Sequence, residues 1–198
     1  MRSSPLQLRS SQRIAHFLEV AATIIAEVGY DSMTMTAIAE RAGASIGALY
    51  RWFPDKTSVA QELRTQYAKE LQDYFKQLIQ DSTGRSVPEF SEALIDGIIE
   101  FTRQRPAWLI LHASTVKPVK DPAARKSLRD EFSRAFRLYA PDLSEEQAFL
   151  TANVALEIIK GLIGAFKQAD EKDRDGLIRE FKVALRLYLS DALAGGGE

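Results

Sequence analysis

Residues 34–56 contain the side chains best suited to bind a partner. The hydroxyls of Thr34, Thr36 and Ser45 lie at or near the starts of two short predicted helices. Free backbone N–H groups at helix starts can bind phosphate oxygens, and neighbouring hydroxyls can add to such contacts. Tyr50 and Arg51 supply further hydrogen-bond donors from the second of these helices. These groups favour the binding of a phosphate backbone over the making or breaking of covalent bonds.

Two short helices would position these groups. Thr34 is placed to cap the first helix, Gly43 to end it, and Ser45 to cap the second. The tight connection Ala-Gly-Ala-Ser lets the second helix cross the first steeply, as in a helix-turn-helix. Gly47 removes a side chain where a backbone could approach DNA closely. Pro54 disfavours helical geometry at the residue before it, so the second helix should end there.

No other set of residues meets the requirements of a metal site or a catalytic centre. The chain has no cysteine, which excludes disulfides, thiol nucleophiles and Cys-based zinc sites. Its two histidines, His16 and His112, fall on different predicted helices. Residues 171–176 imitate the start of a calcium-binding loop, but the twelfth position is Lys182 instead of a bidentate glutamate. We therefore expect no metal, no cofactor and no enzymatic activity.

The composition gives the whole molecule no strong electrostatic field. The 198 residues include 26 basic and 27 acidic side chains, a formal net charge of −1, and 45% are hydrophobic. This is the composition of a soluble globular protein, and we expect a cytoplasmic one without a signal peptide. Residues 1–56 carry six basic and five acidic side chains, a net charge of +1. A basic surface for nucleic acid must therefore be local.

The apolar pattern predicts an all-α protein. Apolar residues recur with a period near 3.6 along almost all of the chain, and no run alternates as in a half-buried strand. Asn153, Glu157 and Lys160 interrupt the apolar stretch of residues 148–166, and each is costly at the centre of a bilayer. We interpret that stretch as a buried helix and expect no membrane partner. The predicted helices cover approximately residues 11–28, 34–42, 45–53, 55–80, 88–104, 107–113, 122–139, 144–168 and 174–193.

Residues 11–59 closely resemble the DNA-binding domain of the TetR (tetracycline repressor) family of bacterial transcriptional regulators. The resemblance extends more loosely to the rest of the chain, whose length and helical makeup suit the family's variable ligand-binding domain. It is carried by an entry helix ending in Gly-Tyr and by the motif residues Gly29, Tyr30, Thr34, Ile38, Ala39, Glu40, Arg41, Ala42, Gly43, Ser45, Gly47, Leu49, Tyr50, Phe53 and Lys56.

The resemblance implies a division of labour. Residues 1–56 would form a three-helix DNA-binding domain, and a long helix would join it to a helical ligand-binding and dimerisation domain, residues 57–198. It also implies that Tyr50 and Lys56 contact the phosphate backbone and that Leu49 and Phe53 are core residues. The predicted DNA-binding residues are Thr34, Thr36, Ser45, Ile46, Gly47, Ala48, Tyr50, Arg51, Trp52 and Lys56.

Two residues depart from the family's common pattern. Ile46 stands where members commonly have a polar or basic residue, so it either reads a thymine methyl group or leaves fewer polar contacts. Trp52 replaces what is often a smaller ring or histidine and could lie over sugar-phosphate. Other interpretations remain open: Tyr50 and Trp52 could be interface or core aromatics, and Arg51 could pair with Asp55.

The second half of the chain is expected to sense a small molecule. Trp108 and His112 lie on a short, almost wholly apolar helix, and Asn153 and Glu157 lie one turn apart on a long apolar helix. Polar groups on buried helices need partners, and a ligand can be one. These four residues are our ligand-binding candidates. The alternatives are that a backbone carbonyl satisfies His112 and that Asn153 and Glu157 face solvent or pair with Lys160.

The last two long helices favour a homodimer. Small residues permit close helix approach, and a helix pair can build a four-helix interface between two subunits. The family resemblance implies the same pairing, although both helices could simply pack within one monomer. The residues that suggest the interface are Ala148, Ala152, Ala155, Gly161, Gly164 and Ala165 on one helix and Phe181, Leu185, Leu187, Tyr188 and Leu189 on the other.

We therefore expect a homodimeric repressor that binds a palindromic double-stranded DNA operator and is released by a small-molecule effector. Two rivals remain at this stage. One is an all-α enzyme or ligand carrier with similar helices, and the other is a helix-turn-helix protein that acts through a protein partner.

Overall fold

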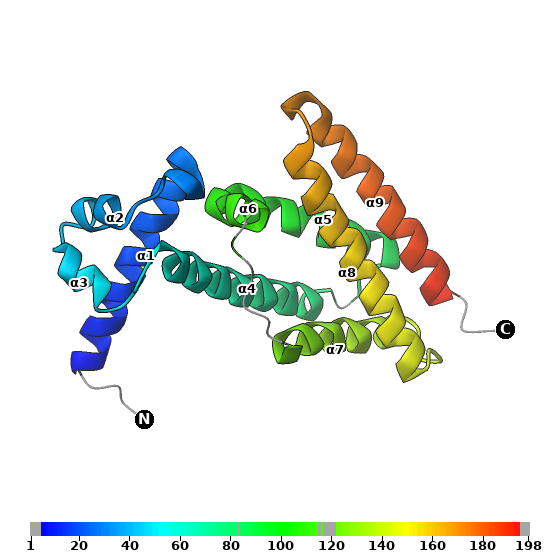
Figure 1. Cartoon of the computed structure of the whole chain (residues 1–198). Coiled ribbons are helices and arrows are strands. Elements are labelled where there is room, and N and C mark those ends of the chain that lie inside the picture. Colours follow the sequence, from blue (N-terminus) through cyan, green and yellow to red (C-terminus); the bar gives the residue numbers. More distant parts are fainter. Residues whose placement is uncertain (1–4, 83, 115, 117–121, 195–198) are drawn as a thin grey trace. The chain divides into compact units, whose positions relative to one another are not determined.

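Every secondary-structure element in the described part of the chain is an α-helix. The computed structural model describes residues 5–82, 84–114, 116 and 122–194. The all-α fold predicted from the 3.6-residue period is confirmed. In chain order the helices are α1 (Pro5–Ser32), α2 (Met35–Arg41), α3 (Ile46–Tyr50), α4 (Lys56–Gln80), α5 (Val87–Gln104), α6 (Pro106–Ala113), α7 (Pro122–Tyr139), α8 (Glu145–Gln168) and α9 (Glu171–Ala194) (Figure 1).

The predicted helix bounds differ from the observed ones mainly at α1 and α3. α1 begins before residue 11 and continues past Gly29, where the backbone leaves helical geometry with φ +82°. Val28, just before this break, is 55% exposed, and the chain buries Tyr30 and Met33 beyond it. α3 ends at Tyr50, and the residues between it and Pro54 form a turn.

The chain divides into two compact units. The first, called the head below, contains Met1–Lys69 and Arg105–Val119; the second, called the helical unit, contains Glu70–Gln104 and Lys120–Glu198. This differs from the expected division after residue 56, because α6 packs against α1 and the boundary falls within α4.

The head is built on one apolar face of α1. Isoleucine, leucine and phenylalanine side chains recur there at helical spacing, and burying such side chains is the main source of stability for short helices. α2 packs on α1 and on α3. The buried residues of this core include Phe17, Leu18, Ala21, Ile25, Met33, Ile38, Leu49, Val59 and Leu63.

Arg64 of α4 forms hydrogen bonds with the end of α6 and with the segment after it, within the head. Its Nη1 donates hydrogen bonds to the carbonyl oxygen of Leu111, at 2.5 Å, and to that of Val116, at 3.1 Å. Burial lowers the pKa of the Arg64 guanidinium, and the two carbonyls replace part of its lost hydration. The end of α6 is therefore held by a charged side chain as well as by apolar packing.

Aromatic rings fill the core of the helical unit. Phe75 of α4 meets Phe132 of α7 edge to face, with ring centroids 5.5 Å apart, and Phe132 meets Phe136 at 5.9 Å. Phe90 of α5 lies 6.4 Å from Phe136. Such arrangements stabilise a core beyond the area that they bury. α7, α8, α5 and α9 pack in the pairs α7·α8, α8·α9 and α5·α9.

α8 begins with a capping box. The Ser144 hydroxyl accepts from the Gln147 N–H at 3.2 Å, while the Gln147 side chain accepts from the Ser144 N–H. Ala148, Ala152 and Ala155 are fully buried. In the described ranges, α8 is the helix whose length and mean hydropathy of 1.5 would suffice to cross a membrane. The core helix of a soluble protein passes the same test.

Candidate nucleic-acid interface

Local hydrogen bonds define both ends of α2. The Thr34 hydroxyl accepts from the Ala37 N–H at 3.1 Å, which makes Thr34 the N-cap. At the other end Gly43 has φ +61°, and its N–H and that of Ala44 donate to carbonyls of the last turn. This is the Schellman arrangement, whose positive φ glycine adopts without strain. The predicted cap and the predicted terminating glycine are both confirmed.

α3 is anchored by two buried side chains and one cap. The Ser45 hydroxyl accepts from the Ala48 N–H at 3.3 Å. Leu49 is fully buried and Phe53 is 6% exposed, so both are core residues as expected. A five-residue helix cannot be stable alone. Its orientation is therefore fixed by these two side chains and by its contact with α2.

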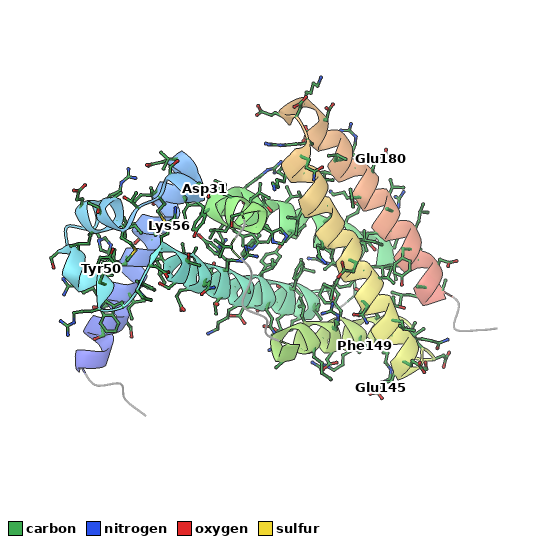
Figure 2. All side chains as sticks on the ribbon, in the orientation of Figure 1. Asp31, Tyr50, Lys56, Glu145, Phe149 and Glu180 are labelled. Atoms are coloured by element: carbon green, nitrogen blue, oxygen red, sulfur yellow. The ribbon has the colours of Figure 1, made fainter. Side chains whose placement is uncertain are left out.

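The other side of α3 is open to solvent. Ile46 is 42% exposed, Tyr50 50% and Trp52 40%; Figure 2 labels Tyr50 on this helix. Gly47 is exposed, and a Cβ placed on it would meet no atom within 4 Å in the part of the chain that the structure describes. Of the remaining predicted DNA-binding residues, Thr34, Thr36, Ser45 and Arg51 are exposed, whereas Ala48 and Lys56 are half-buried.

This exposure decides between some of the alternatives. Tyr50 and Trp52 are not core aromatics, because both lie largely in solvent. Asp55 does not pair with Arg51. Its Oδ1 accepts a hydrogen bond from the Ser58 N–H at 2.7 Å, which makes Asp55 the N-cap of α4. Among the described residues no ion pair engages the Arg51 guanidinium. The end of α3 therefore presents a cation that forms no ion pair with the described residues, beside the exposed rings of Tyr50 and Trp52.

Lys56 joins the start of α4 to the end of α1. Its Nζ donates to the carbonyl oxygen of Asp31 at 2.8 Å and to that of Tyr30 at 3.4 Å, and it lies 4.9 Å from the centre of the Tyr30 ring. The Tyr30 hydroxyl lies 3.3 Å from the Thr57 hydroxyl. An ammonium has three N–H donors, so one remains for a ligand. Figure 2 labels Asp31 and Lys56 in this cluster.

A bidentate ion pair holds α2 against α1. Arg41 Nη1 lies 2.5 Å from Glu27 Oε2, and Nη2 lies 3.0 Å from Oε1. The hydrogen bonds from Arg41 lower the pKa of the Glu27 carboxyl and raise that of the Arg41 guanidinium. Arg41 therefore serves the structure of the head and is not a free cation for a partner.

Trp108 and His112 lie together on α6, in the head. Trp108 is 8% exposed, whereas His112 is exposed to solvent. Their rings are 5.5 Å apart and tilted by 34°. The apolar sequence around His112 thus does not bury its imidazole.

Asn153 and Glu157, in the helical unit, already have partners in the chain. The Asn153 side chain accepts a hydrogen bond from Arg129 Nε and donates one to the Phe149 carbonyl at 3.0 Å. Glu157 is exposed and forms an ion pair with Lys160 at 2.8 Å. The pairing of Glu157 with Lys160, left open from the sequence, is therefore observed.

A hollow of about 420 Å³ opens between α4 and α5 in the helical unit. Burial, followed by the charges of Asp96 and Glu100, raises the pKa of the Tyr74 phenol beside it. Lys182 pairs with Asp96 at 2.7 Å. None of the four predicted ligand-binding residues lines this hollow; those that do are Tyr74, Gln77, Leu78, Asp81, Arg85, Ala93, Asp96, Gly97 and Glu100.

Two family models match this chain. One, described as "Bacterial regulatory proteins, tetR family", matches residues 17–63, and the other, "Tetracyclin repressor-like, C-terminal domain", matches residues 86–189. Together they cover more than half of the sequence. The chain belongs to the TetR family. It is a transcriptional regulator with a helix-turn-helix DNA-binding domain, in a family that is generally non-enzymatic and in which repression and a response to ligands are typical.

Other TetR-family proteins resemble the chain over most of its length. It is 28% identical to the HTH-type transcriptional regulator BetI from Cronobacter sakazakii over 155 residues, which cover 76% of this chain and 77% of that protein. A TetR-family regulator from Pectobacterium atrosepticum has the same fold, with a TM-score of 0.72 and 16% identity over 98% of this chain and 99% of that one. A TetR-family transcriptional regulator from Streptomyces coelicolor has a TM-score of 0.63 and 22% sequence identity, over 91% of this chain and 99% of that one.

Sequence reasoning missed the two contacts that assemble this TetR-family head. The Glu27–Arg41 pair joins residues 14 positions apart, and Lys56 reaches carbonyls 25 and 26 positions earlier. Arg41 is part of the family motif, but its partner, Glu27, lies on α1 outside the motif. Such pairs become visible only once the helices are packed.

Proposed function

We propose that this TetR-family regulator is a homodimeric repressor that binds a palindromic operator through α3 and is released by a small-molecule effector. The exposed face of α3 is the observation that carries the proposal. This face presents Ile46, Gly47 and Tyr50, and the turn after it adds Arg51 and Trp52, while Leu49 and Phe53 hold the helix in place. The proposal assigns the chain no reaction, and it places the protein in the cytoplasm with its operator.

Contacts to the phosphate backbone and contacts to bases have different sources in this proposal. The hydroxyls of Thr34, Thr36 and Ser45, together with Tyr50 and Lys56, are assigned to phosphates, which position a protein on the duplex without reading its sequence. Ile46, Gly47, Ala48 and Arg51 are assigned to base edges in the major groove. A guanidinium there favours guanine. Trp52 is assigned to the sugar-phosphate beside them.

Exposed apolar residues on α8 and α9 support a dimer through these two helices, which lie side by side in Figure 1. Leu150 and Val154 on α8 are 57% and 44% exposed, and Leu187 on α9 is 62% exposed. Gly164 has open space around it. Ala148, Ala152, Ala155, Leu185 and Leu189, by contrast, are fully buried within the helical unit.

The effector is assigned to the helical unit. FadR from Bacillus subtilis, solved with stearoyl-CoA and similar in fold with a TM-score of 0.60 at 14% identity, covers 89% of this chain and supports a ligand-binding role for such a unit. We place the effector at the hollow between α4 and α5. Asp81, Asp96 and Glu100 outnumber Arg85 in its lining, which favours an effector with a cationic or hydrogen-bond-donating group. Trp108, His112, Asn153 and Glu157 remain secondary candidates.

Selection of bound duplexes from random DNA by the full-length protein tests the proposal. We expect an inverted repeat whose half-sites are centred one helical turn, about 34–36 Å, or a multiple of it apart. The triple variant Tyr50→Phe, Arg51→Ala, Lys56→Ala should recover no such sequence. Recovery of the same repeat by this variant, or no enrichment by the wild type, would contradict the proposed surface.

A further inference from the structure

We propose that the protein recognises thymine in each half of its operator by its C5-methyl group, and that Ile46 is the residue that reads it. This inference rests on the proposed function, because it assumes that α3 lies in the major groove. It goes further by naming a base, an atom of that base and the side chain that selects it.

The first turn of α3 offers a base edge almost no hydrogen-bonding side chain. Ile46 is aliphatic, Gly47 has no side chain, and Ala48 carries a half-buried methyl group. The Ser45 hydroxyl lies against the helix start, where it accepts from the Ala48 N–H at 3.3 Å. Strong donors follow only one turn later, with Tyr50. Base discrimination by the first turn must therefore be chiefly apolar.

Ile46 is available for such a contact and is not needed by the core of the head. It is 42% exposed, whereas Leu49 and Phe53, which anchor the same helix, are 0% and 6% exposed. Covering an exposed aliphatic side chain is favourable because it removes apolar surface from water. In the major groove the thymine methyl is the apolar group that distinguishes one base from the others. An A·T pair placed against Ile46 is thus bound better than a G·C pair.

Gly47 gives the neighbouring base room to come close. A Cβ at this position would meet no atom of the described residues within 4 Å, so none of them fills the space in front of it. Apolar groups are in contact only when their heavy atoms approach to about 4.0–4.5 Å. A larger residue at position 47 would hold the duplex away from the Ile46 side chain.

Replacement of thymine by deoxyuridine tests the inference directly. The probes are the duplex recovered by selection from random DNA and a set in which one thymine at a time becomes deoxyuridine, which removes the methyl and keeps the hydrogen-bonding edges. Losing one buried methyl should weaken binding about fourfold at one position in each half-site. Replacing the sensitive thymine in both half-sites at once should weaken binding more than tenfold. Unchanged affinity for every uracil duplex would overturn the inference.

Two variants assign the methyl contact to its residue. Ile46→Ala should bind the thymine and uracil duplexes with nearly equal affinity at the sensitive position. Val28→Ala, which trims another exposed aliphatic side chain on α1, should keep the fourfold difference, and both variants should unfold at the wild-type temperature. If Ile46→Ala keeps the full difference, another residue reads the methyl. A wild-type protein that selects no sequence would instead overturn the proposed function itself.

Discussion

No contact with the residues that the structure describes requires glycine at position 47. Its surroundings are empty, and unlike Gly29 and Gly43 it has no positive φ. Glycine in a helix costs about 0.5–1 kcal/mol relative to alanine. Gly47→Ala should therefore raise the free energy of unfolding, by up to about that amount, and yet lower operator affinity several-fold. Thermal unfolding and titration of labelled operator would measure the two effects separately.

Gly176→Ala is the matched control for this change. Gly176 lies on α9 in the helical unit, and the nearest atom to an added Cβ is a flexible Arg179 nitrogen at 3.9 Å. The control should stabilise the protein in the same way and leave operator binding unchanged. If Gly47→Ala binds operator as well as the control does, the proposed close approach of DNA to position 47 is contradicted.

Tyr50 and Lys56 should behave differently although both are assigned to phosphates. Tyr50→Phe removes a hydroxyl from a half-exposed ring and should weaken binding of every duplex alike without changing stability. Lys56→Ala also removes the hydrogen bonds to the carbonyls at the end of α1, so it should lower the melting temperature as well. Calorimetry beside operator titration separates the two variants. Equal melting temperatures would contradict the structural role of Lys56.

Single residues were predictable where a local rule decides them. The caps Thr34 and Ser45 depend on hydrogen bonds within three residues, and Gly43 depends on one backbone angle. The exposure of His112 could not be predicted, because the sequence shows only that its neighbours are apolar.

At the scale of helices, α2 is held to α1 by a charged pair that acid should break. The pKa of the Glu27 carboxyl is lowered in the folded state by Arg41. A carboxyl of this kind stabilises the fold above its unfolded pKa, and the contribution disappears as the pH falls through its lower folded pKa.

Glu27→Gln should therefore lower stability at neutral pH and make no difference once the wild-type carboxyl is protonated. Because both side chains are nearly half exposed, the effect should be modest and should shrink with added salt. Denaturant unfolding of wild type and variant between pH 3 and pH 7 measures it. A constant gap across that range would mean that packing, not charge, is responsible.

Helix positions followed from periodicity, but helix partners did not. The 3.6-residue period identifies which face of α1 or α4 is apolar, and those faces are buried. It does not say which helix covers a face. The placement of α6 with the head, and the burial of the α8 alanines inside the helical unit, both depend on contacts between distant segments.

At the scale of the whole molecule, Gly164→Arg should produce a folded monomer. The open space around Gly164 lets the chain accept the side chain, but a buried charge cannot enter an apolar interface without a large cost. Sedimentation should show a dimer for the wild type and a monomer with weak operator affinity for the variant. Ala123→Arg, at an exposed position of α7, should remain dimeric. A wild-type monomer at micromolar concentration would contradict the proposed assembly.

Effector and operator should each weaken the binding of the other by the same factor. If an effector found by thermal-shift screening weakens operator binding tenfold, the operator must weaken effector binding tenfold, because the two bindings share one coupling free energy. Titrating each ligand in the absence and presence of the other measures both factors. An effector that binds the protein but leaves operator affinity unchanged would contradict release as the mechanism.

The site as a whole was only partly predictable. The α3 residues could be predicted because they form a contiguous motif on one short helix. The ligand candidates are scattered, with Trp108 and His112 in the head and Asn153 and Glu157 in the helical unit. The hollow is lined from two helices that share no motif. A contiguous motif can be recognised in the sequence, whereas a cavity forms only when distant segments pack together.

The head is assembled from two stretches of chain that are separated by thirty-five residues of the other unit. α6 covers α1, and Arg64 bonds to carbonyls 47 and 52 positions further along. During synthesis, the ribosome therefore delivers α3 long before it delivers α6, which completes the head. A nascent chain that ends at residue 69 has the residues proposed to contact DNA but leaves part of α1 uncovered. Full closure must wait until all of α5 and α6 have emerged.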